Sequence, residues 1–194
     1  MFHMLSGFAM LMAGDWPAAI AFTERSIALG SETNEPLMQY LSWDTNAAAH
    51  NQLGEAEAAL AGRARALDIR RSHGGGLLKD WFDVVEAESY LKAGRVAEAI
   101  EQANKVALAS RPTGNMVSLA VAARVIGAGL AKLGGAPAEV DRHLQESLAL
   151  ASGNGLVIEN LRTELVCAQI AAARGEHPAA ATHFQRAQAL LTPE

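Results

Sequence analysis

The stretch QLGEAEAALA at residues 52–61 has an outline that returns in MAGDWPAAIA (12–21), KAGRVAEAIE (92–101) and ARGEHPAAAT (173–182). Each copy has a glycine followed by a run rich in alanine. KLGGAPAEVD (132–141) fills the one gap in the series. The best-matching glycines lie 40, 40, 41 and 40 residues apart: Gly14, Gly54, Gly94, Gly135 and Gly175. A fixed interval of this size indicates stacked supersecondary units.

Small residues at fixed distances from the glycines support this frame. Those five residues later are Ala19, Ala59, Ala99, Val140 and Ala180. Those seven residues earlier are Gly7, Ala47, Ala87, Ala128 and Ala168. Small side chains allow two helix backbones to approach closely, so these positions predict the crossing points of paired helices. In the fourth copy Gly134 competes with Gly135, and the frame there could shift by one residue.

Each unit is predicted to be a helix, a tight turn at glycine, a second helix and a longer loop. Pro17, Pro137 and Pro178 fall in the first turn of the second helix, where proline is tolerated. The expected fold is all-α: a right-handed α-solenoid of about five antiparallel helix pairs, formed by one array over residues 1–194. The repeats are expected at roughly 1–33, 34–73, 74–113, 114–154 and 155–194.

Composition narrows the function classes. The formal net charge of −5 argues against a broad nucleic-acid-binding face. A single cysteine, Cys167, rules out a disulfide within the chain. No Lys or Arg precedes Arg25, so a secretory signal is not expected, and no apolar run is long enough to span a membrane. These features predict a cytoplasmic protein.

The repeat resembles the tetratricopeptide repeat (TPR). That resemblance is carried by the turn glycine, the alanine five residues later, and endings such as RALDI (65–69) and SLALA (147–151). Trp43 and Tyr90 stand where the family often has aromatic residues. The usual unit has about 34 residues, whereas this one has 40. The long, alanine-rich form is similar to repeats in bacterial ATP-dependent transcription regulators and nucleotide cyclases. Another 40-residue variant occurs in peptide-pheromone receptors.

The resemblance implies that the first helices line a concave groove. The candidate binding residues are the groove-facing ones: Met4, Phe8, Leu41, Asp44, Ala48, Asn51, Trp81, Val84, Glu88 and Arg162. Members that bind C-terminal carboxylates use a clamp of Lys, Asn and Arg in the groove, and the clamp positions of the first three repeats here hold other residues: Met4, Phe8, Asp44, Thr45, Trp81 and Val85. We expect it to take an amphipathic or extended peptide, or an apolar ligand with a positive group. Alternatively, Phe8 and Trp81 simply pack between repeats.

The leading functional hypothesis is a non-catalytic module that binds a protein or peptide, as a scaffold or regulatory segment of a larger bacterial signalling or transcription regulator. The alternative is a small-ligand or peptide-pheromone sensor. No cofactor, metal or direct nucleic-acid contact is expected. The methionine-rich N-terminal helix could form a homodimer surface, or be the face that an upstream repeat covers.

Other motifs favour structural roles over chemistry. HGGG (73–76) resembles a lipase oxyanion loop but lacks the G-x-S-x-G elbow, so it is expected to be a loop between repeats. Gly127 and Gly129 are expected to allow close helix packing. Cys167 is expected to be a buried, inert thiol. RARALDIRRSH (63–73) could dock an acidic partner, but a solvated helix face is the favoured interpretation.

Overall fold

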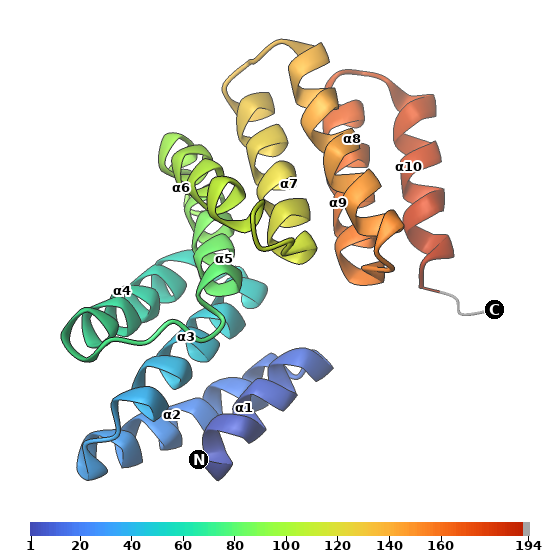
Figure 1. Ribbon diagram of the computed structural model, residues 1–194. Coiled ribbons are helices and arrows are strands. Elements are labelled where there is room, and N and C mark those ends of the chain that lie inside the picture. Colours follow the sequence, from blue (N-terminus) through green and yellow to red (C-terminus); the bar gives the residue numbers. More distant parts are fainter. Residues whose placement is uncertain (192–194) are drawn as a thin grey trace. The chain divides into compact units, whose positions relative to one another are not determined.

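The computed structural model describes residues 1–191, and every regular element in this range is an α-helix (Figure 1). The prediction of an all-α fold is confirmed. The helices are α1 (Phe2–Ala13), α2 (Trp16–Thr33), α3 (Pro36–Leu53), α4 (Ala56–His73), α5 (Lys79–Lys92), α6 (Val96–Ser110), α7 (Met116–Lys132), α8 (Pro137–Gly153), α9 (Val157–Ala173) and α10 (His177–Ala189). The last predicted repeat, 155–194, extends past the described residues at its final three positions.

The helices form two compact units. The first covers Met1–Arg95 and contains α1 to α5, and the second begins at Val96 and contains α6 to α10. Within the first, α3 packs between α2 and α4; within the second, α7 packs between α6 and α8. The predicted repeat boundaries fall between α2 and α3, α4 and α5, α6 and α7, and α8 and α9. The division between the units falls inside the third predicted repeat, after its turn glycine Gly94.

The same backbone turn ends each first helix. The turn glycine has a positive φ, its N–H bonds to the carbonyl three residues earlier, and the next N–H bonds to the carbonyl four residues before the glycine. This is the Schellman geometry, in which a left-handed residue satisfies the last helical carbonyls. The turn glycines are Gly14, Gly54, Gly94, Gly134 and Gly175.

One glycine of the predicted frame is therefore wrong. Gly134, with φ of 71°, is the left-handed residue of the fourth turn, and the Gly135 N–H makes the second turn hydrogen bond, to the Leu130 carbonyl. Gly135 is an extra residue before α8, which begins at Pro137. Seven residues before Gly134 stands Gly127, so the small position of the fourth repeat is Gly127 and not Ala128. The insertion explains why the second-helix positions nevertheless matched Gly135.

Close helix crossings account for the small residues. A Cβ on Gly7 would lie 2.6 Å from Thr23 Cγ2, and one on Gly127 would lie 3.0 Å from Leu144 Cδ2. A Cβ on Gly129 would lie 2.7 Å from Ile100 Cγ1. The packing role predicted for Gly127 and Gly129 is thus confirmed. The cores of both units consist largely of alanine and valine, because backbones this close leave little room for longer side chains.

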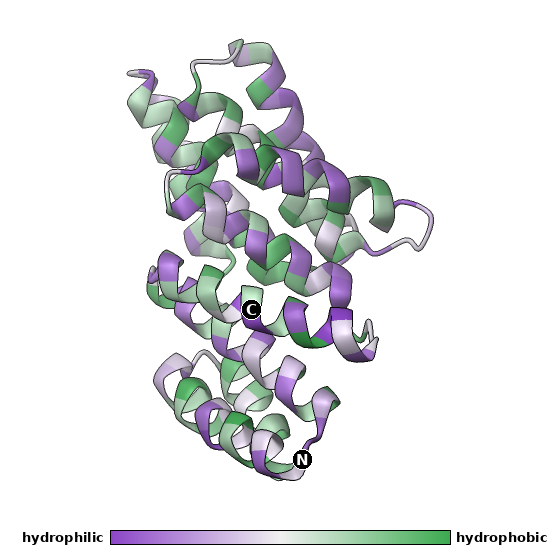
Figure 2. Ribbon diagram, turned by 90° about the vertical axis from the view of Figure 1, so that its left-hand side faces the viewer, coloured by the Kyte–Doolittle hydropathy of each residue, from purple (hydrophilic) through white to green (hydrophobic). Residues whose placement is uncertain are grey.

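Polar and apolar residues are interspersed along the helices, as the hydropathy colouring in Figure 2 shows. This pattern suits helices that bury one face against a neighbour and expose another. Within residues 1–191, no helix combines the length and apolar character needed to cross a membrane.

Candidate functional site

A buried ionic cluster joins α3, α4 and α5 in the first unit. Arg63 of α4 is only 3% exposed, and its Nη1 donates to Asp44 Oδ1 of α3 at 2.5 Å. Its other nitrogens pair with Asp83 and Glu86 of α5. Arg70, seven residues further along α4, donates from Nη2 to Asp44 Oδ2.

Charges within this ionic cluster balance. Three carboxylates, of Asp44, Asp83 and Glu86, face the cations of Arg63, Arg70 and Lys79. The Arg70 guanidinium also lies over the Tyr40 ring, 4.8 Å from its centroid. Burial raises the pKa of Asp44 to about 6, although both arginines pull it down. For Arg63, burial by itself would lower the pKa of the guanidinium. The neighbouring carboxylates of Asp44, Asp83 and Glu86 outweigh burial and raise that pKa above its usual value.

The sequence-based interpretation of RARALDIRRSH is wrong for two of its arginines. Arg63 and Arg70 lie inside the unit, whereas Arg65 and Arg71 are exposed as predicted. Residues seven apart share one face of a helix, and Asp83 and Glu86, three apart, share a face of α5. These spacings indicate that the two arginines lie on one face of α4 and the two carboxylates on one face of α5. The missing information was that Asp44 lies opposite both arginines.

The predicted groove residues divide into two groups by exposure. Five of them are buried: Leu41, Asp44, Ala48, Asn51 and Val84. Five are half-buried: Met4, Phe8, Trp81, Glu88 and Arg162. Nine of the ten belong to the first unit, while Arg162 lies on α9 of the second unit and pairs with Glu159 at 3.1 Å. Because Asp44 is paired internally, its carboxylate is not presented to a ligand.

Phe8 of α1 and Trp81 of α5 form an aromatic strip on the first unit. Their ring centroids are 6.1 Å apart in an edge-to-face arrangement, and Trp81 also meets Phe82 at 4.8 Å. Trp81 packs against the buried core, as the alternative interpretation expected. Both rings nevertheless keep part of their surface exposed. Trp81 therefore anchors the strip on the core, and both rings remain partly accessible.

Polar groups connect α5, which carries Trp81, with α3. The side-chain amide of Asn51 donates to Glu88 Oε2 at 3.5 Å, and Lys92 Nζ donates to the Asn51 carbonyl. These contacts tie the end of α3 to α5. Glu88 stays half-buried, so an acidic group lies on the helix that carries Trp81.

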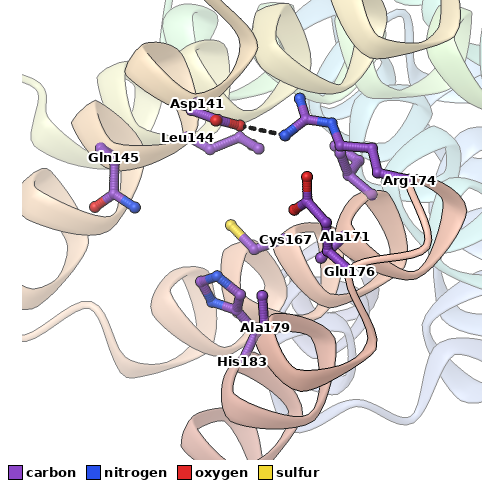
Figure 3. Close-up of a pocket in the computed structure, with 10 residues that line it drawn as sticks. Asp141, Leu144, Gln145, Cys167, Ala171, Arg174, Glu176, Ala179 and His183 are labelled. Atoms are coloured by element: carbon purple, nitrogen blue, oxygen red, sulfur yellow. Dashed lines mark hydrogen bonds and ion pairs between the residues drawn. The ribbon is translucent and has the colours of Figure 1, made fainter. Parts of the chain in front are cut away.

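The second unit contains a cavity of about 170 Å³ between α8, α9 and α10 (Figure 3). Arg174 Nη1 donates to Asp141 Oδ1 at 2.8 Å on one side of it. On another side, His183 Nδ1 lies 2.6 Å from Glu164 Oε2. Cys167 also lines the cavity. Burial, with the nearby carboxylates of Glu164 and Asp141, raises the pKa of this thiol to about 12.

Cys167 does not have the properties of a nucleophilic cysteine. A nucleophilic cysteine needs a lowered pKa, and that of Cys167 is raised. The prediction of a buried thiol is confirmed, since Cys167 is 6% exposed. In the described part of the chain, no three His, Cys, Asp or Glu side chains are grouped so that they could hold a metal ion.

Comparison with solved structures identifies the fold. RapI in its apo form aligns with a TM-score of 0.64 and 15% identity, over 97% of this chain and 52% of that one. The TPR-like repeats of a putative kinesin light chain from Podosopora anserina align with a TM-score of 0.63, and a variant of those repeats with 0.65, each at 16% identity over 97% of this chain. The chain has a TPR-like helical-repeat fold.

The chain spans about half the length of RapI and matches the kinesin light chain repeats over 92–93% of theirs. No model of a known protein family matches the sequence, and no curated protein does. The TPR-like assignment thus rests on the structure and on the repeat frame.

Proposed function

We propose that this TPR-like chain is a non-catalytic module that binds a protein or peptide through the aromatic strip of Phe8 and Trp81. The observation that carries the proposal is the partial exposure of two large rings in contact with each other, one of which, Trp81, packs against the core. Aromatic side chains held rigid in this way are favoured anchors in binding interfaces, because little conformational entropy is lost when they are covered.

The chemistry around the strip indicates the class of peptide. Phe8 and Trp81 favour an apolar anchor residue, and Glu88 on α5 favours a basic residue beside it. The net charge of −5 attracts a basic segment over a longer range. We therefore infer a peptide with apolar and basic residues, and no direct contact with nucleic acid.

Peptides selected from a random display library on the immobilised full chain provide the probe. Titration calorimetry should show that Trp81→Ala weakens the selected peptides about tenfold or more, as loss of a central anchor does. Trp43→Ala is the matched control, because Trp43 is also half-buried and packs against the same core but stands on α3. Equal effects of the two substitutions would contradict the proposal, since they would reflect loss of packing alone.

A small-ligand sensor is the second candidate, and the cavity in the second unit favours it. Its polar lining, including Asp141, Arg174 and His183, suits a small charged metabolite. Drug-sized sites usually have about 300–1,000 Å³, so the cavity suits only a very small ligand. Native mass spectrometry of the chain purified from its source would support this candidate if a small molecule co-purified, and count against it if none did.

The setting of the module is also a proposal. The 40-residue interval and the match to about half of RapI support a segment of a larger cytoplasmic signalling or transcription regulator. We further propose that the methionine-rich helix α1 mediates self-association. The proposal is supported by the exposure of Phe2, Leu5 and Met12 of α1 and of Met1 directly before it.

A further inference from the structure

Helix α1 carries an apolar stripe that no other described helix covers. Phe2 is 73% exposed and Leu5 57%, and Ala9 continues the stripe one turn further. The spacing of three and four residues places all three on one face of the helix. The sequence of α1 contains no Asp, Glu, Lys or Arg. Exposed side chains of this size on one face of a helix indicate a contact surface.

The repeat frame identifies what kind of surface this is. Phe2 stands twelve residues before the turn glycine Gly14, and the equivalent residues are buried: Ser42, Phe82, Ala122 and Thr163. The same holds for the equivalents of Ala9 in α3, α5 and α7. In each of these helices the position faces the second helix of the preceding pair. Ser42 donates a hydrogen bond to Ser26 of α2, at 2.8 Å, and Thr163 bonds Ser147 of α8, at 2.9 Å.

Helix α10 shows the opposite face of the same junction. Phe184 is 51% exposed, although the equivalent residues of the other second helices are almost completely buried: Thr23, Arg63, Ala103 and Leu144. Those residues are covered by the next first helix. Asn46 of α3 donates to Thr23 Oγ1 at 3.0 Å, and Leu144 packs with Cys167 of α9. Phe184 thus occupies a position that a following first helix covers elsewhere in the chain.

We propose that the occupant of the α1 stripe is α10 of a second copy of this chain, joined head to tail. The inference rests on the proposed self-association and specifies its geometry. In the junction of α4 with α5, Ala66 and Phe82 share one core cluster. Ala187 of α10 is equivalent to Ala66, and Phe2 of α1 is equivalent to Phe82. A junction of α10 with α1 of the next copy would therefore pair an alanine with a phenylalanine, as the junction of α4 with α5 does. Phe184 of one copy then lies against Leu5 of the next, and the contact is apolar on both sides.

Such an interface is heterologous, because the two copies contribute different surfaces. It therefore leaves one free α1 and one free α10 in every open assembly. Sedimentation velocity of the full chain should show a mass that rises with concentration. Leu5→Glu and Phe184→Glu should each lower the association constant about a hundredfold or more, because each buries an unpaired charge.

Mixing the two variants gives the decisive measurement. The Leu5→Glu copy keeps an intact α10, and the Phe184→Glu copy keeps an intact α1, so an equimolar mixture should form a heterodimer that stops at two chains. Leu108→Glu, at an exposed position of α6, is the control and should assemble like the unmodified chain. Circular dichroism checks that each variant is folded.

Three results would overturn the head-to-tail contact. One is an unmodified chain that stays monomeric at every concentration. Another is a Phe184→Glu variant that still dimerises while Leu5→Glu does not, which would show two α1 helices paired with each other. The third is a mixture that remains monomeric although the unmodified chain assembles. None of these results bears on peptide binding, which is measured separately with Trp81→Ala.

Discussion

Arg63 and Leu144 occupy the same place in their repeats but have opposite chemistry. Each lies on a second helix, is 3% exposed and contacts the first helix of the next pair: Arg63 meets Asp83, and Leu144 packs with Cys167. The junction of α4 with α5 fills this place with a balanced ionic cluster, and the junction of α8 with α9 fills it with an aliphatic side chain. The repeat frame therefore fixes the backbone and the small residues at the helix crossings, while the residue buried at this place is free to vary.

The two solutions differ in what they contribute. Burial of an ion pair gains little net stability, because desolvation offsets the attraction, but removal of one partner is costly. Burial of leucine contributes directly through the hydrophobic effect. An ionic cluster also restricts the partners that a helix accepts, since any other neighbour leaves charges unpaired. The α4 junction is thus the more selective one, and the α8 junction is the more tolerant.

The largest expected effect is that of Arg63→Met. The substitution leaves Asp44 and Asp83 without their main cation, and we expect the free energy of unfolding of the first unit to fall by about 3–5 kcal/mol. All three tryptophans, Trp16, Trp43 and Trp81, belong to that unit, so urea unfolding followed by tryptophan fluorescence reports on it alone. Arg65→Met, at an exposed position of α4, should change the free energy of unfolding by less than about 0.5 kcal/mol. Similar effects of both variants would show that the ionic cluster is unimportant.

Leu144→Ala should have the next largest effect, about 2–4 kcal/mol, through lost apolar contact and the space left beside Gly127. The second unit has no tryptophan, so its unfolding appears in far-ultraviolet circular dichroism and not in fluorescence. We expect the dichroism transition to shift and the fluorescence transition to stay in place. A shift of both transitions together would show that the two units unfold as one.

Sequence reasoning was sufficient for the parts of the fold that depend on backbone geometry. Glycine at a left-handed turn and a small residue at a crossing are local requirements, so they recur at a fixed interval and can be counted. Pairing across helices is not local. Nothing in RARALDIRRSH shows that Asp44 faces Arg63 and Arg70, because that contact depends on the orientation of α3. For the same reason, the buried half of the predicted groove residues could not be separated from the accessible half.

The shift at Gly134 has a similar explanation. Two adjacent glycines satisfy the composition of the turn equally well, and only the hydrogen bonds decide which is left-handed. The second helix of that repeat keeps its own register from Gly135 onwards, so positions counted from either glycine match one helix and miss the other. When all positions of a repeat are counted from one glycine, an inserted residue in the turn cannot be detected.

Acidification should change the stability of the ionic junction by a smaller amount than these substitutions do. The pKa of Asp44 is about 6 in the folded chain, above its ordinary value of 3.8. At a pH between these two values, the Asp44 carboxyl is protonated in the folded state and ionised in the unfolded state. The contribution of Asp44 to the free energy of unfolding should therefore rise as the pH falls from 7 towards 4. Fluorescence-detected urea unfolding at pH 7.5 and pH 5 should show the unmodified chain gaining stability relative to Asp44→Asn. A relative loss at pH 5 would indicate that the two arginines hold the carboxylate ionised.

The last expected effect is on a labelling rate and concerns Cys167, which packs with Leu144 in the aliphatic junction of the second unit. Because burial raises the pKa of the thiol to about 12, almost no thiolate is present at pH 8. Iodoacetamide reacts with the thiolate, so labelling of the folded chain should be slower than labelling in urea by about a hundredfold or more. Leu144→Ala should speed the labelling by admitting water and reagent beside the sulfur, whereas Arg63→Met, in the other unit, should not. Fast labelling of the unmodified chain would mean that the cavity between α8, α9 and α10 opens readily. That result would support the hypothesis that the second unit binds a small ligand.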